Sequence, residues 1–397
     1  MTMQSIAEID IREKKLLIRV DFDTAVSRSG EIADVRKLTH TLPTIRYAIG
    51  QKARVILAAH MSGAGGRMSR RYSLEPFGRK LSEMLDREIY FPEDSVGDAV
   101  KKISGDMLPG TVMLLENLEF HKGELSDSQD FAKRLSEVAE IYVNEAFSVS
   151  HQRRASLLSI TNYFDTACVG LKFREELDNL GRFAAPERPF AALVGGSCSS
   201  AKTGLMESLL DRVDIMLVGG AIAHPFLRAL GRDTGRSEID EGTIYSAKKL
   251  ISSCMSRNIR LVIPEDFVAV RGDLNSEPSS YIISGGRIPG DSMAVDIGPE
   301  TSRQFAKHLS RARTILWNGP LGMCERAGFG EGTLAAAKAL AGSDAWGAVV
   351  GDSTIDALEG AGFEAGNCFI SRGGDASVEF IRDGTLPAVQ ALEGRLR

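Results

Sequence analysis

Short apolar runs alternate with amphipathic stretches from one end of the chain to the other. Each run is rich in Val, Ile, Leu and Ala and is bounded by Gly, Pro or polar residues, as buried strands are. Segments between them, such as 74–85 and 130–139, carry apolar residues at helical spacing. This alternation predicts an α/β fold with parallel sheets and helices on both faces. We expect strands at 16–20, 54–60, 112–117, 141–147, 190–196, 215–220, 260–264, 314–320 and 347–352.

The 397 residues exceed what a single hydrophobic core usually supports, which favours two domains. The best boundary is the segment 173–189, which begins as a charged amphipathic helix and ends in a proline-containing turn. Strand-like runs resume directly after it. We therefore predict two doubly wound parallel-sheet domains, at 1–170 and 190–375, joined by a hinge helix and linker at 171–189.

Composition and charge exclude several classes of protein. The net charge is −5 and no basic tail compensates for it, which argues against nucleic acid as a partner. No apolar run approaches the roughly 18 residues of a membrane span, and the first ten residues do not resemble a secretory signal. The five cysteines lie far apart without C-x-x-C or metal-ligand spacing. We therefore expect reduced thiols in a cytoplasmic protein and no zinc site.

Charged residues lie at the carboxyl end of the first predicted strand. Arg19, Asp21 and Asp23 alternate there, and His60 ends the second strand. Ligands of parallel α/β sheets bind at this edge, and charges held there are costly without a partner. These residues therefore predict a binding site in the first domain, although a lone histidine such as His60 is often structural.

The second half carries three glycine pairs that follow apolar runs. Glycine lets backbone amides approach phosphate closely, and a helix N-terminus adds favourable partial charge. One pair is a weak signal, but three in one domain predict a nucleotide site. The segment 196–203 is not a P-loop, because Ala201 stands where the second glycine belongs. The pairs are Gly195 with Gly196, Gly219 with Gly220, and Gly373 with Gly374.

Four motifs together resemble the phosphoglycerate kinase family: LLIRVDFD at 16–23, LLENLEF at 114–120, VNEAF at 143–147 and WNGPLG at 317–322. The resemblance runs almost end to end. It implies a monomer that closes two domains around its ligands, with a C-terminal tail, 376–397, returning to the first domain. It also implies phosphoryl transfer between Mg²⁺-bound ATP or ADP and a carboxylate.

The resemblance implies nucleotide-binding residues in the second half. Lys202 matches a phosphate-binding and catalytic lysine of the family, although a solvated helix lysine is the alternative. Cys198 replaces the family's other loop lysine, and Asp375 adds an anion to a loop that faces phosphate. Asp352 matches the magnesium-binding residue, but the glycines before it are shortened. The other implied nucleotide-binding residues are Asn318, Gly319, Glu325, Gly351 and Ser353.

On the acceptor side, Arg36 matches the arginine that stabilises the phosphoryl group in flight, a role that suits a planar guanidinium. The family's three substrate arginines are replaced by Gly63, Glu119 and Gln152. One charge-assisted hydrogen bond contributes about 1.5–3 kcal/mol, so phosphate recognition should weaken strongly. Nearby basic residues could grip an anion differently or form a solvated edge; these are Arg67, Arg70, Arg71, Arg153 and Arg154. The expected substrate-binding residues are Arg19, Asp21, Asp23, His60, Arg153 and Arg154.

Three functions remain open from the sequence. The first is a kinase of this family that acts on a carboxylate other than, or in addition to, 3-phosphoglycerate. Survival of Arg19, Arg36 and Lys202 favours it. The second is ordinary phosphoglycerate kinase with relocated arginines. The third is a nucleotide-binding pseudoenzyme or regulatory protein, which Cys198 and Asp375 support.

Overall fold

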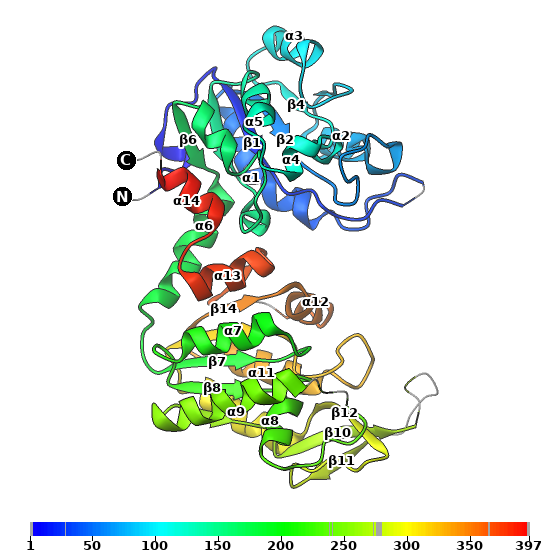
Figure 1. The fold of residues 1–397 in the computed structure, drawn as a ribbon, viewed down its shortest axis with the longest axis vertical. Coiled ribbons are helices and arrows are strands. Elements are labelled where there is room, and N and C mark those ends of the chain that lie inside the picture. The colour runs from blue at the N-terminus through cyan, green and yellow to red at the C-terminus, as the bar shows by residue number, and fades with distance from the viewer. Residues whose placement is uncertain are drawn as a thin grey trace. The chain divides into compact units, whose positions relative to one another are not determined.

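The computed structural model describes residues 3–27, 29–237, 239, 241–272, 274, 280–363 and 366–394. The chain forms two compact units (Figure 1). Unit 1 comprises Met1–Asp178 and Thr385–Arg397, and unit 2 comprises Asn179–Gly384. The last three residues of the predicted tail lie outside the described residues, as do a few positions in each predicted domain.

Unit 1 is built on a six-stranded sheet in the order β3-β4-β2-β1-β5-β6, and every neighbouring pair is parallel. The first strand of the chain is central, and the strand order reverses between β1 and β5. Such a reversal creates a crevice at the carboxyl ends of the strands where ligands bind. The strands are β1 Lys15–Arg19, β2 Arg54–Ala58, β3 Ile89–Tyr90, β4 Val112–Leu114, β5 Ile141–Asn144 and β6 Thr166–Val169.

The helices of unit 1 bury apolar faces against this sheet. Leu38 of the first helix and Phe77 of the second join Ile18 of β1 in one core cluster. The rings of Phe22 and Phe77 stack with centroids 5.9 Å apart. The helices are α1 Arg36–Gly50, α2 Glu75–Leu85, α3 Asp98–Asp106, α4 Lys122–Leu125, α5 Gln129–Ser136 and α14 Pro387–Glu393. The helix α6, Leu171–Leu180, begins in unit 1, and its last two residues belong to unit 2.

The C-terminal helix α14 packs within unit 1, although the chain reaches it only after completing unit 2. Ala388 lies in a buried cluster with Ala146, Val149 and Leu157, and its amide donates to the Ser150 carbonyl at 3.1 Å. Figure 1 shows this red helix beside the green segments of the same unit. The last helix therefore completes the core of the first unit.

Unit 2 repeats the same plan. Its parallel sheet has the order β15-β14-β13-β7-β8-β9, with the reversal between β7 and β13. Its strands are β7 Phe190–Val194, β8 Ile215–Val218, β9 Arg260–Val262, β13 Thr314–Asn318, β14 Trp346–Val350 and β15 Cys368–Ser371. Its helices are α7 Ser200–Leu209, α8 Ala223–Ala229, α9 Glu241–Ser256, α10 Pro299–Leu309, α11 Glu331–Ala341, α12 Asp352–Gly360 and α13 Asp375–Asp383.

A second sheet in unit 2 is antiparallel and was not expected from the sequence. Its strands are β10 Asp266–Arg271, β11 Ser280–Ser284 and β12 Ser292–Ile297, in the order β11-β10-β12. Phe267 and Ile283 of this sheet pack against Leu227 of α8. In Figure 1 these strands lie at the end of unit 2 next to α8. The sheet therefore extends the carboxyl edge of unit 2 with an apolar wall.

Among the described residues, no helix combines the length and apolar composition needed to cross a membrane.

Candidate functional site

The carboxyl edge of the unit 1 sheet holds a hydrogen-bonded carboxylate. Asp21 accepts from Lys37 Nζ at 2.8 Å, from Ser148 Oγ at 2.6 Å and from the Asp23 amide at 2.9 Å. Burial disfavours its charged form, but the positive charge of Lys37 and the hydrogen bonds outweigh burial and lower the pKa of Asp21. Asp21 is therefore a fixed anion at neutral pH, and it immobilises the start of the loop after β1.

Arg19 and His60 form a buried pair beside Asp21. Arg19 Nη2 lies 2.9 Å from His60 Nδ1, and its Nε donates to Ser156 Oγ at 2.8 Å. Burial and the nearby guanidinium lower the pKa of His60, so the ring is neutral. Because a guanidinium only donates, Nδ1 accepts and Nε2 carries the proton. Arg19 is fully buried and thus faces His60 rather than open space.

The Nε2 atom of His60 is the polar group of this pair that remains available. It is buried, has no hydrogen-bond partner among the described residues and lies 3.8 Å from Asp23 Oδ2. Asp23 meanwhile accepts from the Ser62 amide at 2.9 Å and from Ser62 Oγ at 2.6 Å. The arrangement offers one neutral N–H donor and one carboxylate at the mouth of the sheet edge.

Glu119 joins all three positions at which the family's arginines are replaced. Its Oε1 accepts from Arg154 Nη1 at 2.7 Å, and its Oε2 accepts from the Gly63 amide at 3.1 Å. Arg154 Nε in turn donates to Gln152 Oε1 at 2.8 Å. Both charged side chains are largely buried, at 5% and 13% exposure. The positive charge of Arg154 is therefore already neutralised by the Glu119 carboxylate.

The other predicted basic residues of unit 1 lie at the surface. The Arg153 side chain is 77% exposed and lies 3.6 Å from Asp127 Oδ2. Arg36 begins α1 and pairs with Asp34, Nη2 to Oδ2 at 2.7 Å, while remaining 41% exposed. Exposed arginines also occupy the loop after His60; they are Arg67, Arg70 and Arg71. The solvated-edge interpretation fits these three and Arg153 better than a preformed anion grip.

The predicted glycine-rich loops of unit 2 meet at the β7/β13 reversal. The Gly195 amide donates to the Asn318 carbonyl at 2.8 Å, and the Gly196 amide donates to the Pro320 carbonyl at 2.5 Å. A Cβ on Gly195 would lie 2.3 Å from the Pro320 carbonyl oxygen, and one on Gly319 would lie 2.1 Å from the Gly195 oxygen. Glycine is required at both positions because the two loops touch through their backbones.

Lys202 points back from α7 into this junction. Its Nζ donates to the Gly195 carbonyl at 2.6 Å, and the Ser199 side chain caps the helix by accepting from the Lys202 amide at 3.4 Å. Burial lowers the pKa of Lys202 to about 8. A partly desolvated ammonium at a helix N-terminus suits a phosphate oxygen, because the phosphate would stabilise its charged form.

The neighbouring strand ends add the groups expected around a metal-bound phosphate. Asn318 Nδ2 donates to the Val350 carbonyl at 3.1 Å, while its buried Oδ1 has no partner among the described residues. Asp352 begins α12 directly after Gly351, and Gly374, before α13, lies near its carboxylate. Within the described ranges no cluster of three or more metal-ligating side chains occurs. One carboxylate beside a phosphate site fits Mg²⁺, which takes few protein ligands and uses phosphates and waters.

Asp375 is the first residue of α13, and its side chain is exposed. Because the carboxylate is solvated, it is a weaker obstacle to phosphate than a buried anion would be. Gly373 lies two residues before it, in the turn after β15, and is buried.

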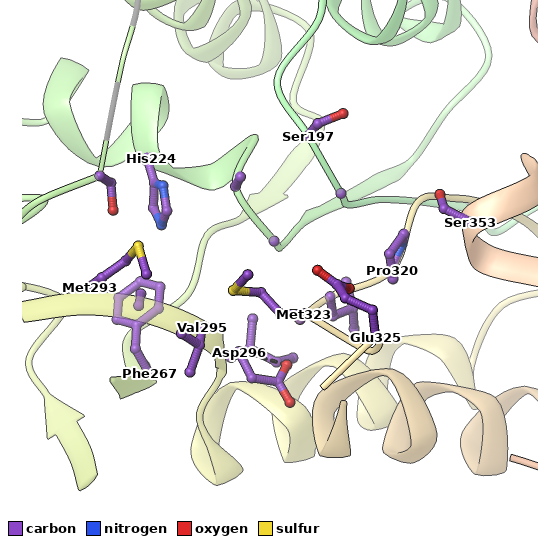
Figure 2. A pocket seen from close by; sticks show the side chains of 18 residues that line it. Ser197, His224, Phe267, Met293, Val295, Asp296, Pro320, Met323, Glu325 and Ser353 are labelled. Carbon is purple, nitrogen blue, oxygen red and sulfur yellow. Dashed lines mark hydrogen bonds between the residues drawn. The ribbon is translucent and has the colours of Figure 1, made fainter. Parts of the chain in front are cut away.

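A cavity of about 470 Å³ opens beside these loops, within unit 2 (Figure 2). Four predicted nucleotide residues line it: Gly196, Gly220, Glu325 and Ser353. Gly219 lies between the end of β8 and Gly220, and a Cβ there would lie 2.6 Å from Leu321 Cδ2. Sequence reasoning missed the rest of the lining, because much of it belongs to the unpredicted antiparallel sheet. The missed residues include His224, Ser237, Phe267, Met293, Val295, Asp296 and Met323.

The chain as a whole is similar to proteins of known function. A family model described as phosphoglycerate kinase matches residues 6–384. The phosphoglycerate kinase of Pelotomaculum thermopropionicum is 40% identical over 393 residues, 99% of each chain, and that of Desulfosudis oleivorans is 39% identical over 392 residues, 98% of this chain and 99% of that one.

Solved structures agree with these relatives. The chain is similar to phosphoglycerate kinase from Coxiella burnetii, with a TM-score of 0.90 and 32% identity over the whole of both chains. It is also similar to the enzyme from Pyrococcus horikoshii, with a TM-score of 0.85 and 27% identity over 99% of each chain.

Proposed function

The chain belongs to the phosphoglycerate kinase family, and from this premise we propose that its acceptor is a carboxylate other than, or in addition to, 3-phosphoglycerate. The protein is a phosphotransferase with a carboxylate acceptor and uses ATP or ADP with Mg²⁺. In the kinase direction a carboxylate oxygen attacks the γ-phosphorus, the bond to the ADP oxygen breaks, and an acyl phosphate forms.

One observation carries the proposal: the ion pair between Glu119 and Arg154, at 2.7 Å. A phosphate bound there would have to displace Glu119 from Arg154 or lie beside an uncompensated carboxylate. Each charge-assisted hydrogen bond forgone is worth about 1.5–3 kcal/mol, so a substrate phosphate gains little from this site. An acceptor carboxylate whose other end is neutral or hydroxylated fits better, because Glu119 and Arg154 already neutralise each other.

We assign the acceptor to unit 1 and the nucleotide to unit 2. Asp23 and the Nε2–H of His60 would position the acceptor, and Arg36 would leave Asp34 to stabilise the phosphoryl group in transfer. Lys202 would bind the nucleotide phosphates, as would the amide of Gly220. Asp352 would hold Mg²⁺, which supplies charge neutralisation when bound.

Phosphoryl transfer to 3-phosphoglycerate is the second candidate. The names of the relatives favour it, as do the direct hydrogen bonds of Arg154 to Glu119 and Gln152, two of the three positions at which the family's arginines are replaced. In that case Arg154 would exchange Glu119 for the substrate phosphate.

Initial rates with Mg-ATP, read by hydroxylamine trapping of acyl phosphates, separate the candidates. The acceptor panel should include 3-phosphoglycerate, glycerate and other small hydroxylated carboxylates. We expect kcat/KM to be higher for an acceptor without the phosphate than for 3-phosphoglycerate, with Arg36→Ala as the inactive reference. If 3-phosphoglycerate is the best acceptor of the panel and is turned over hundreds of times per second, the second candidate is favoured. Absence of trapping with every acceptor would contradict both.

We also propose that the protein acts as a monomer in the cytoplasm, without nucleic-acid or membrane partners. All five cysteines are free thiols, as a reducing compartment allows. Sedimentation of the purified chain at micromolar concentration tests the oligomeric state.

A further inference from the structure

Glu124 of α4 is a fully buried carboxylate close to the unit 1 site. Its Oε1 accepts from Ser156 Oγ at 2.6 Å, and its Oε2 accepts from the Ser156 amide at 2.9 Å. Five residues earlier in the chain, Glu119 binds Arg154 of the same loop. Because both carboxylate oxygens of Glu124 are occupied within the fold, this residue can influence a bound acceptor only through its neighbours.

Ser156 connects this carboxylate to Arg19. A hydroxyl has one proton, and Ser156 Oγ donates it to Glu124, so the same oxygen accepts from Arg19 Nε at 2.8 Å. Arg19 also donates to the Val20 carbonyl and, from Nη2, to His60 Nδ1 at 2.9 Å. The guanidinium is fully buried, and Glu124 Oε1, which lies 4.0 Å from Nη2, supplies the opposite charge that such burial requires.

The direction of each hydrogen bond in this series is fixed by the groups themselves. A carboxylate only accepts and a guanidinium only donates, so His60 Nδ1 accepts from Arg19. The proton of the neutral ring then lies on Nε2, a buried atom without a hydrogen-bond partner among the described residues. Since a buried N–H without an acceptor is unfavourable, a ligand oxygen at Nε2 would be stabilised.

We infer that Glu124 and Ser156 act through Arg19 as positioning residues for the acceptor. They keep the guanidinium against His60 Nδ1, and the ring therefore offers its Nε2–H to the acceptor carboxylate. The inference rests on the proposed assignment of the acceptor to unit 1 and adds which buried groups prepare its donor. Without the Ser156 hydroxyl, Arg19 Nε loses its acceptor and the guanidinium can turn away from the ring. The other tautomer would then form, and its Nε2 lone pair would repel a carboxylate oxygen.

Nitrogen NMR of the full chain with ¹⁵N-labelled histidine reads the tautomer directly and needs no ligand. The chain has six histidines, and His60→Gln identifies the signals of His60. In the wild type we expect the Nε2–H tautomer alone, whereas Ser156→Ala should add signals of the Nδ1–H tautomer. Ser156→Ala should also raise the KM of the best acceptor in the hydroxylamine-trapping panel by about three- to tenfold, the effect of one hydrogen bond. The kcat and the Mg-ADP affinity should be unchanged, because the lost contact only binds the acceptor.

Ser156→Thr and Ser159→Ala are the matched controls. The first retains the hydroxyl, and the second removes a neighbouring buried hydroxyl that donates to Asp127 Oδ1 at 2.7 Å. Both variants should keep the single tautomer and the wild-type KM. Glu124→Gln removes the opposite charge of Arg19 and should resemble Ser156→Ala; if it does not fold, Ser156→Ala alone decides.

A single Nε2–H tautomer of His60 in the folded Ser156→Ala and Glu124→Gln variants would overturn the inference, even if the KM rose, because their effect would then be structural only. Failure to trap an acyl phosphate with every acceptor would contradict the proposed function. The tautomer is measured without an acceptor, so it would still test the inference in that case.

Discussion

At the residue scale, Glu119 connects the positions at which the family's substrate arginines are replaced. Its carboxylate joins Gly63 and Arg154, so the replaced positions form one closed hydrogen-bond network rather than a set of independent losses. Restoring the family's arginines is also difficult at one of these positions. Gly63 has φ +104°, and a Cβ there would lie 3.0 Å from the Tyr72 ring. Restoring an arginine at this position would therefore strain the backbone, so the network is better probed through Glu119 itself.

Glu119→Gln should improve the use of 3-phosphoglycerate. The amide retains the size of the side chain and can still accept from the Gly63 amide, but it no longer neutralises Arg154. We expect the KM for 3-phosphoglycerate to fall roughly tenfold, the scale of one charge-assisted hydrogen bond. Steady-state kinetics at fixed Mg-ATP measures it.

Asp127→Asn is the matched control, because it removes the carboxylate partner of the exposed Arg153. It should leave this KM unchanged. A KM for Glu119→Gln equal to or above that of the wild type would mean that Arg154 does not reach the substrate.

Arg36→Ala should lower kcat by about 10²–10³-fold, the effect of removing one donor that stabilises transition-state charge. Mg-nucleotide affinity should hardly change, because the interaction belongs to the transition state. Arg36→Lys should not rescue the rate, since an ammonium cannot reproduce the planar fork.

Arg46→Ala provides the comparison on the same helix α1. That side chain is exposed and donates to the Met84 carbonyl at 3.2 Å. Arg46→Ala should retain the wild-type kcat. If Arg36→Ala and Arg46→Ala have similar kcat values, Arg36 does not take part in catalysis.

At the element scale, continuous burial explains which strands could be predicted. β1, β7 and β13 are buried almost throughout and read as uninterrupted apolar runs, and all nine expected strands form. β10 to β12 mix exposed, half-buried and charged positions, so their sequences lack that signal. The loop glycines and the charges after β1 could be found for the same reason: they directly follow recognisable strands.

The residues at the apolar end of the unit 2 cavity could not be predicted from local sequence patterns. Phe267 and Met293 come from the unpredicted antiparallel sheet, and their proximity to His224 is a consequence of tertiary packing alone. A histidine four residues after the Gly219–Gly220 pair was the one local signal. The partners of the predicted arginines were equally invisible, because Glu119 and Arg154 are 35 residues apart in sequence.

The start of α6 is capped by a buried carboxylate, Glu145. Glu145 accepts from the Lys172 and Phe173 amides, both at 3.1 Å, and from Thr44 Oγ1 at 2.6 Å. Burial raises the pKa of Glu145 to about 7 even though these hydrogen bonds oppose the shift. Between about pH 4.5 and 7 the folded state therefore binds more protons than the unfolded state. The contribution of Glu145 to the free energy of unfolding falls as the pH rises through this window.

Glu145→Gln should remove that dependence, on the order of 1–3 kcal/mol between pH 5 and pH 8, because the amide does not titrate and its oxygen can still cap the helix. Urea unfolding at both pH values, with hydrogen exchange at the Lys172 and Phe173 amides, measures it. Asp130→Asn, at an exposed position of α5, should preserve the wild-type slope. If Glu145→Gln also preserves it, the carboxylate is not the titrating group.

At the scale of the whole molecule, the chain builds two sheets of the same plan and then returns to the first. In each sheet the first strand is central and the order reverses beside it, so each unit has its own crevice at the carboxyl edge. Both tryptophans, Trp317 and Trp346, belong to unit 2, and Trp317 is fully buried. Tryptophan fluorescence therefore reports on unit 2 alone, while circular dichroism reports on both units.

Deletion of residues 385–397 should separate the stabilities of the two units. The segment buries Leu386, Val389 and Leu392 almost completely in unit 1, so unit 1 should lose on the order of 5 kcal/mol at about 1.5–3 kcal/mol per large apolar side chain. Circular dichroism should then show an earlier unfolding transition, while the tryptophan transition and Mg-ADP affinity remain those of the full chain. Gln390→Ala, at an exposed position of α14, should change neither transition. An equal shift of both transitions on deletion would instead mean that the units unfold together.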